Sequence, residues 1–77
     1  MKILVITEHD TPYPEYRIER WRKAGHFVRA RCSHCAPGGY DALIKSWKAQ
    51  GGDTIWIEST NTIMGATPPG STGRRAA

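Results

Sequence analysis

The sharpest chemical motif in the sequence is Cys32-Ser33-His34-Cys35, which places two thiols three positions apart. This C-x-x-C spacing allows two thiolates to bind one metal ion, and zinc then needs two further ligands. No second C-x-x-C and no H-x-x-x-H is present to supply them as a pair. The candidate metal ligands are therefore Cys32, Cys35, His34 and His9, with His26 as a further imidazole.

The same spacing also suits thiol–disulfide exchange, in which a helix N-terminus lowers the pKa of the first thiol and the second thiol resolves the mixed disulfide. A strand, a helix, a second strand, the CSHC motif and another helix resemble the thioredoxin superfamily in their order, and His34 before the second cysteine is similar to its oxidising members. The resemblance implies that Cys32 attacks and Cys35 resolves. The sequence departs from the family at Pro37, Gly38 and Gly39, which separate the motif from the helix. The third interpretation is two reduced thiols that pack at a strand end.

Alternating strand-like and helix-like segments must position these residues. The unbroken apolar run at 3–6 predicts a strand buried on both faces, and the segments 27–32 and 54–58 predict two further strands. A helix is expected at 14–24, and another at 40–50. The second helix has the clearest amphipathic pattern, with apolar side chains at i, i+3, i+4 and i+7, namely Tyr40, Leu43, Ile44 and Trp47.

Strands that alternate with helices imply parallel pairing through right-handed crossovers. The sequence therefore predicts an α/β fold, a small β-α-β-α-β domain with a three-stranded parallel sheet. The order 2-1-3 is preferred because the wholly apolar first strand belongs in the centre; the orders 1-2-3 and 1-3-2 would need a different strand protected on both sides. "MKILVIT", a helix and "AGHFV" resemble the opening of many sugar-nucleotide glycosyltransferases and related Rossmann-like proteins, which implies the same parallel topology.

The domain is expected to span residues 1–59, and residues 60–77 to form a flexible C-terminal tail. The tail has no acidic residue and almost no periodicity, although Ile63 and Met64 could pin its first part to the sheet. A three-stranded sheet leaves two edges, so a homodimer formed through a sheet edge is one expected assembly.

Ligands of open α/β sheets gather at the carboxyl ends of the parallel strands. Here those ends carry polar side chains, and we expect them to converge on one rim: Thr7, Glu8, His9 and Asp10 after the first strand, residues 32–35 after the second, and Glu58, Ser59 and Thr60 after the third.

Charged and aromatic residues suggest a surface for a partner. The net charge is +4 and the isoelectric point is near 9.4, which invites a nucleic-acid interpretation through Arg17, Arg20, Arg29 and Arg31. Residues 1–59, however, carry nine basic and seven acidic groups, so much of the excess lies in the tail. Trp21 and Trp47 are expected in the core, whereas Trp56 is expected on the other face, exposed with Tyr13 and Tyr16.

No apolar run approaches the roughly 18 residues of a membrane span, and the opening residues do not resemble a secretory signal, so we expect a cytoplasmic protein without a membrane partner.

Glycine-rich phosphate motifs and a complete catalytic constellation are missing from the sequence, which argues against an enzyme. The sequence favours a non-catalytic binding or regulatory module, without a cofactor, that engages a protein partner through Tyr13, Tyr16, Trp56, Arg17, Arg20, Arg29 and Arg31. The first alternative is a thiol-redox or zinc-binding protein that uses Cys32-Ser33-His34-Cys35, and the second is a nucleic-acid-binding accessory protein.

Overall fold

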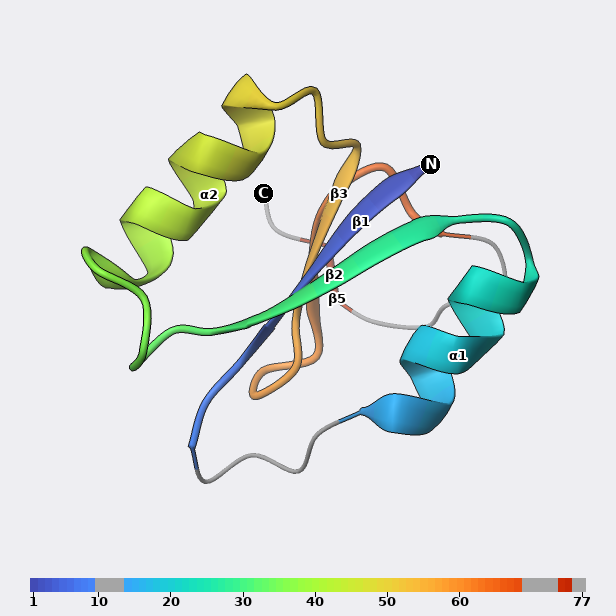
Figure 1. The fold of residues 1–77 in the computed structure, drawn as a ribbon, viewed down its shortest axis with the longest axis horizontal. Coiled ribbons are helices and arrows are strands. Elements are labelled where there is room, and N and C mark those ends of the chain that lie inside the picture. The colour runs from blue at the N-terminus through green and yellow to red at the C-terminus, as the bar shows by residue number, and fades with distance from the viewer. Residues whose placement is uncertain (10–13, 69–73, 76–77) are drawn as a thin grey trace.

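The fold is an α/β sandwich in which one sheet separates two helices. The computed structural model describes residues 1–9, 14–68 and 74–75. The elements follow in the order β1 (Lys2–Thr7), α1 (Glu15–Lys23), β2 (Phe27–Cys32), α2 (Gly39–Ala49), β3 (Thr54–Ile57), β4 (Thr62–Gly65) and β5 (Arg74–Arg75). Figure 1 shows α1 and α2 on opposite sides of the sheet. The predicted α/β class is thus confirmed.

The strand β1 lies inside the sheet, with β2 on one side and β3 on the other. Both neighbours run parallel to it, so that Ile3 is paired with Val28 on β2 and with Thr54 on β3. Consecutive side chains of a strand point to opposite faces, and the apolar run of β1 therefore needs a cover on each face. The helices provide these covers, and the preferred order 2-1-3 is confirmed for the three parallel strands.

Each helix closes one apolar layer. On the α1 side of the sheet, Ile18 and Trp21 of the helix pack with Ile3, Val5, Val28, Trp56 and Ile63. On the α2 side, Trp47 packs with Leu4, Ile6 and Ile55, and Tyr40, Leu43 and Ile44 complete this layer from partly buried positions. The periodic positions of the second predicted helix therefore face the sheet, as do Ile18 and Trp21 of α1. Trp21 and Trp47 are buried, as the sequence predicts.

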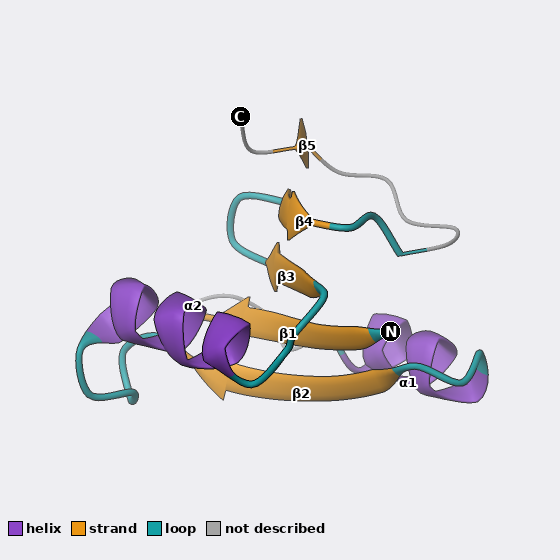
Figure 2. Ribbon diagram, turned by 90° about the horizontal axis from the view of Figure 1, so that it is seen from above, coloured by secondary structure: helices purple, strands orange, loops and turns teal. Residues whose placement is uncertain are grey.

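The sheet continues beyond the three expected strands. In the described residues β4 pairs antiparallel with β3, and β5 pairs with β4, so the sheet is mixed and has the order β2-β1-β3-β4-β5 (Figure 2). The expectation of a flexible segment is wrong for Thr62–Gly65. Asn61 turns the chain with a φ of 53°, in the left-handed region that asparagine tolerates better than most residues. Ile63 is then only 1% exposed, because its side chain packs beside Trp56 in the apolar layer on the α1 side.

Trp56 is a buried residue, and its expected exposure to a partner is wrong. It is 1% exposed and packs edge-to-face against Trp21, with 5.8 Å between the ring centroids. The guanidinium of Arg17 lies 4.3 Å from the centroid of its ring and also forms an ion pair with Glu58. The indole N–H of Trp56 donates to the carboxylate of Glu58. The alternation with Ile55 and Ile57 placed Trp56 on the correct face, but α1 covers that face and Ile63 of β4 packs in the same cluster.

The substitution Trp56→Ala should therefore destabilise the fold rather than remove a surface contact. Truncating a buried tryptophan typically costs about 3–5 kcal/mol, a large part of the roughly 4–12 kcal/mol expected for a chain of 77 residues. Tyr16→Ala is the matched control, because Tyr16 is 77% exposed and should change stability by no more than about 0.5 kcal/mol. Urea unfolding followed by circular dichroism measures both. Equal unfolding midpoints for the two variants would contradict this packing.

Candidate metal centre

Parallel pairing of β1 and β2 brings two potential ligand segments to the same rim. Thr7, the last residue of β1, is in register with Cys32, the last residue of β2. The pairing extends one residue further, because the N–H of Ser33 donates to the carbonyl of Thr7 at 2.9 Å. The chain therefore leaves both strands at neighbouring points. His9 follows β1 at this rim, and the C-x-x-C motif begins with the last residue of β2.

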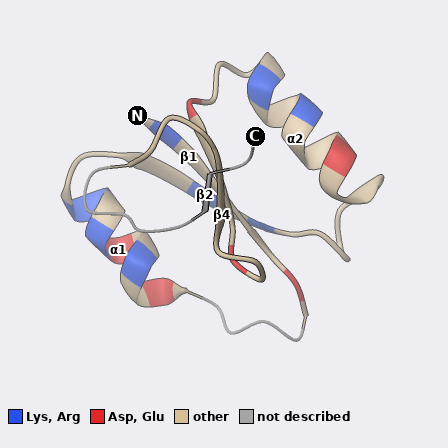
Figure 3. Cartoon of the chain, turned by 180° about the vertical axis from the view of Figure 1, so that it is seen from behind, with Lys and Arg blue, Asp and Glu red and all other residues tan. Residues whose placement is uncertain are grey.

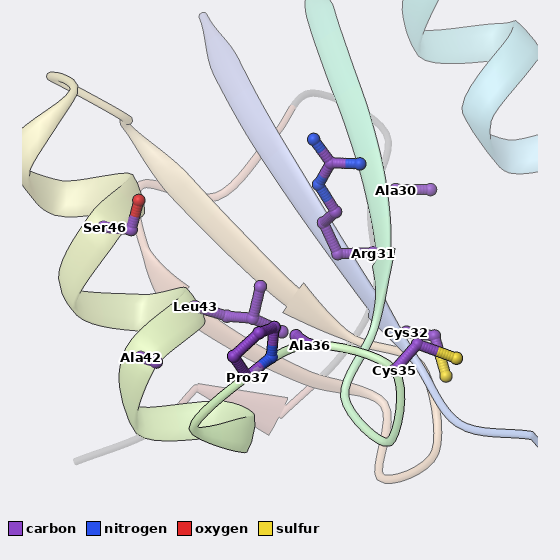
Figure 4. Close-up of a pocket in the computed structure, with 9 residues that line it drawn as sticks. All are labelled: Ala30, Arg31, Cys32, Cys35, Ala36, Pro37, Ala42, Leu43 and Ser46. Atoms are coloured by element: carbon purple, nitrogen blue, oxygen red, sulfur yellow. The ribbon is translucent and has the colours of Figure 1, made fainter.

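A tight turn then folds Cys35 back onto Cys32. The N–H groups of Cys35 and Ala36 both donate to the carbonyl of Cys32, at 3.2 and 3.1 Å. Gly38 follows with a φ of 83°, where a Cβ atom would also lie 2.7 Å from the Cβ of Ala42, so glycine is needed for the chain to enter α2. Figure 4 shows the sulfurs of Cys32 and Cys35 side by side at the end of β2.

The ligand atoms of His9, Cys32 and Cys35 all lie within 4.8 Å of one another. The Nε2 atom of His9 is 3.5 Å from the Sγ of Cys35 and 4.0 Å from the Sγ of Cys32. A tetrahedral zinc ion with ordinary bond lengths separates a sulfur ligand from a nitrogen ligand by about 3.6 Å. The three atoms are thus close to the spacing that one zinc ion requires. Both cysteines are free thiols.

The other two histidines are not part of this group. His34 lies between the cysteines and stacks on His9, with 5.2 Å between the ring centroids and 28° between the planes. His26 precedes the start of β2, at the other end of the strand, where its Nδ1 lies 3.1 Å from the N-terminal nitrogen of Met1. Of the predicted ligands, the structure therefore brings together His9, Cys32 and Cys35. The ring of His34 stacks on that of His9.

The two thiols differ in acidity. Burial favours a raised pKa for Cys32, but hydrogen bonds from the Cys35 side chain and from the backbone of Cys35 and His34 outweigh it and lower the pKa. The hydrogen bond with Cys32 raises the pKa of Cys35, and burial and the negative charge of the Cys32 thiolate raise it further. The thioredoxin resemblance implies that a helix N-terminus lowers the pKa of Cys32. Here the helix is not the cause of the lowered pKa, because α2 begins only at Gly39.

The carboxylates of the rim have partners of their own. Glu8 accepts a hydrogen bond from the hydroxyl of Tyr40, a residue that sequence periodicity assigned only to the helix core. Glu58 is held by Arg17 and the indole of Trp56 on the α1 side of the sheet. Asp10, also expected at the rim, lies outside the described residues. Glu8 therefore connects the segment after β1 to α2, and Tyr40 is a contributor that the spacing alone could not identify.

The residues expected to bind a partner do not form one surface. Tyr16 is exposed beside Arg20, whose guanidinium carbon lies 5.8 Å from its ring centroid, whereas Arg17 is engaged with Glu58. Tyr13 lies outside the described residues. The other two predicted residues, Arg29 and Arg31, are on β2. Figure 3 shows the basic residues distributed over both helices and the sheet.

Arg29 and Arg31 face the α2 side of the sheet. Phe27, Arg29 and Arg31 share one face of β2, and the ring of Phe27 stacks on Trp47 of α2 with 6.5 Å between the centroids. Arg17 and Arg20 belong to α1, which covers the opposite face. The four arginines predicted to contact nucleic acid are therefore divided between two sides of the molecule. Within the described ranges, no helix is long and apolar enough to span a membrane.

Cys32 should react before Cys35 with an alkylating agent, because its lowered pKa keeps it as a thiolate at lower pH. Limited treatment with iodoacetamide, followed by peptide mass spectrometry, measures the modified fraction of each cysteine. Repeating the measurement across pH should place the rise in the rate for Cys32 at a lower pH than that for Cys35. Earlier modification of Cys35 would contradict the hydrogen-bond arrangement.

Comparison with known proteins assigns no family to this arrangement. A scan against protein-family models found no match, and neither a search of curated proteins nor a search of solved structures found one.

Proposed function

We propose that this protein binds a zinc ion through His9, Cys32 and Cys35. The observation that supports the proposal is the convergence of one imidazole and two thiols within 4.8 Å, from the segment after β1 and from the end of β2 with its following turn. Two thiolates and an imidazole suit zinc, whose tetrahedral sites are built from these ligands. The lowered pKa of Cys32 helps as well, because a cysteine binds metal as the thiolate.

Three protein ligands leave one position of a tetrahedral ion for water or for a ligand from another molecule. His9 and Cys35 are exposed and Cys32 is partly buried, so the proposed site is open to solvent. Its ligands lie outside both apolar layers of the fold. We therefore infer that zinc binding adds to an already folded domain and does not create the fold.

Thiol–disulfide exchange is the competing use of the same two cysteines. It needs Cys32 as a reactive thiolate with Cys35 beside it, and the lowered pKa of Cys32 favours this use as well. The position of His9 against both sulfurs is the observation that favours zinc, because disulfide exchange does not require a third ligand. A metal titration separates the two uses.

The reduced protein should bind one zinc ion per chain, and His9→Ala, Cys32→Ser and Cys35→Ser should each weaken binding by at least about a hundredfold, since each removes a ligand. Competition with a chromophoric chelator gives the affinity, and cobalt substitution reports thiolate coordination through its charge-transfer absorption. Lowering the pH should weaken binding, because protons compete for the thiolates and the imidazole.

The matched control is His26→Ala, which also removes an imidazole but at the other end of β2. It should bind zinc like the unaltered protein. Saturating zinc at about a hundred times its dissociation constant should stabilise the unaltered fold by about 2.7 kcal/mol and should not stabilise Cys32→Ser. Equal zinc affinity in the His9→Ala and His26→Ala variants would exclude His9 as a ligand. An unaltered protein that takes up no zinc while reduced would overturn the proposal.

The interpretation as a partner-binding module remains a second proposal, but its binding surface differs from the one predicted from the sequence. Trp56 is buried and Arg17 is engaged with Glu58, so neither is available as a free contact. The observation that now favours a protein partner is the outer edge of β2, which no strand of the described residues covers.

A further inference from the structure

The strand β2 is the outermost strand on its side of the sheet and pairs only with β1 among the described residues. Its backbone groups alternate between the two sides of the strand. Phe27 and Ser33 donate their N–H groups toward the β1 segment, to the carbonyls of Met1 and Thr7. By this alternation, the backbone groups of Val28, Ala30 and Cys32 point outward, away from β1.

Some of these outward groups are already used within the chain. The carbonyl of Val28 accepts a hydrogen bond from Arg22, and the carbonyl of Cys32 accepts two from the turn that follows it. At the centre of the strand, both the N–H and the carbonyl of Ala30 remain on the outer edge, with the N–H groups of Val28 and Cys32 on either side. This edge therefore presents more donors than acceptors, and an added peptide strand can pair with them.

Arg29 and Arg31 determine which peptide suits this edge. They lie two residues apart on the α2 face of β2 and are both exposed. Arg29 rests 5.8 Å from the centroid of Phe27, and neither arginine forms an ion pair with any residue in the described part of the chain. Side chains of an adjacent strand that stand opposite them share their face. Acidic residues at alternate positions would meet both guanidinium groups.

A groove beside Arg31 provides room for the stems of such side chains. It has a volume of about 570 Å³ and lies between the end of β2 and α2 (Figure 4). Besides Arg31, it is lined by residues of β2, of the turn that follows and of α2, namely Ala30, Cys32, Cys35, Ala36, Pro37, Ala42, Leu43 and Ser46. An apolar lining next to one cation suits glutamate, which has an aliphatic stem and a terminal carboxylate.

We propose that the outer edge of β2 binds an extended acidic peptide by strand addition, with glutamates at alternate positions facing Arg29 and Arg31. A second copy of this chain fits less well, because pairing β2 with itself brings four arginines together at one face. Nucleic acid would contact the arginines but has no alternating backbone to pair with Ala30. The groove adjoins the proposed metal centre, because Cys32 and Cys35 also line it, although their sulfurs lie on the side of β2 away from α2 (Figure 4).

The experiment uses a fluorescein-labelled heptapeptide of threonine and valine with glutamate at its third and fifth positions, and a matched peptide with lysine there. Fluorescence anisotropy should show at least about tenfold tighter binding of the glutamate peptide. The double variant Arg29→Glu/Arg31→Glu should reverse this preference. The control Arg20→Glu/Lys23→Glu makes the same change in net charge on α1 and should retain the preference.

Methylation of peptide nitrogens tests the strand pairing itself. Only alternate residues of an added strand direct their N–H groups at β2. Methylating one alternate set of nitrogens should weaken binding of the glutamate peptide at least tenfold, and methylating the other set should leave it unchanged. Equal effects of both sets would refute strand addition, even if the charge preference were present.

Two further outcomes would overturn the proposal. One is tight, salt-sensitive binding of a single-stranded oligonucleotide that requires Arg29 and Arg31, together with no peptide binding. The other is a dimer in sedimentation experiments that Arg29→Glu/Arg31→Glu disrupts, because β2 would then be occupied by a second copy. The peptide experiments use the reduced, zinc-free protein, so their outcome does not depend on the metal proposal, and failure of that proposal and failure of this one are distinguishable.

Discussion

The burial of β1 on both faces is the constraint on which the rest of the structure depends. Its side chains from Ile3 to Ile6 are at most 2% exposed, and a strand of this kind is stable only with a layer on each face and a partner on each edge. The two crossovers meet this requirement by placing α1 and α2 on opposite faces and β2 and β3 on opposite edges. The topology follows from one apolar run.

The same constraint produces the candidate metal centre. Parallel pairing with β2 fixes Thr7 opposite Cys32, so whatever follows the two strands must emerge at one rim. A turn closed on the carbonyl of Cys32 then returns Cys35 to the side of His9. The apolar layers hold the ends of both strands without using any of the three ligands, and the rim is therefore free to carry polar and reactive side chains.

Sequence patterns predict what depends on neighbours along the chain. The helical spacing of Tyr40 and Trp47 and the apolar run of β1 locate their elements within a residue or so. The strand β4 escapes this reasoning, because its two apolar residues lie in a segment whose glycines and prolines resemble a tail. The turn residues Ser59, Thr60 and Asn61 before it are the signal that could have indicated a hairpin. The burial of Trp56 could not be predicted for the same reason, since Ile63 of β4 is its neighbour in the sheet.

The metal centre shows the same limit at the scale of single side chains. The C-x-x-C spacing is local and visible in the sequence, and parallel topology predicts that His9 approaches it. Which histidine completes the group depends on the turn after β2, and that turn leaves His34 stacked on the ring of His9 rather than among the ligand atoms. A motif of four residues cannot specify where the His34 side chain points, because the backbone of the turn sets that direction.

The alternation of β2 finally explains how one short strand can serve two separate surfaces. Arg29 and Arg31 occupy one face and Ala30 and Cys32 the other, since consecutive residues of a strand point in opposite directions. Cations therefore line the α2 side while the thiol of Cys32 lies on the other side. A slip of one residue in the pairing with β1 would exchange these faces, burying arginine beneath α1 and turning the thiol away from His9. The register of β1 and β2 thus fixes both the proposed metal centre and the charge pattern of the free edge.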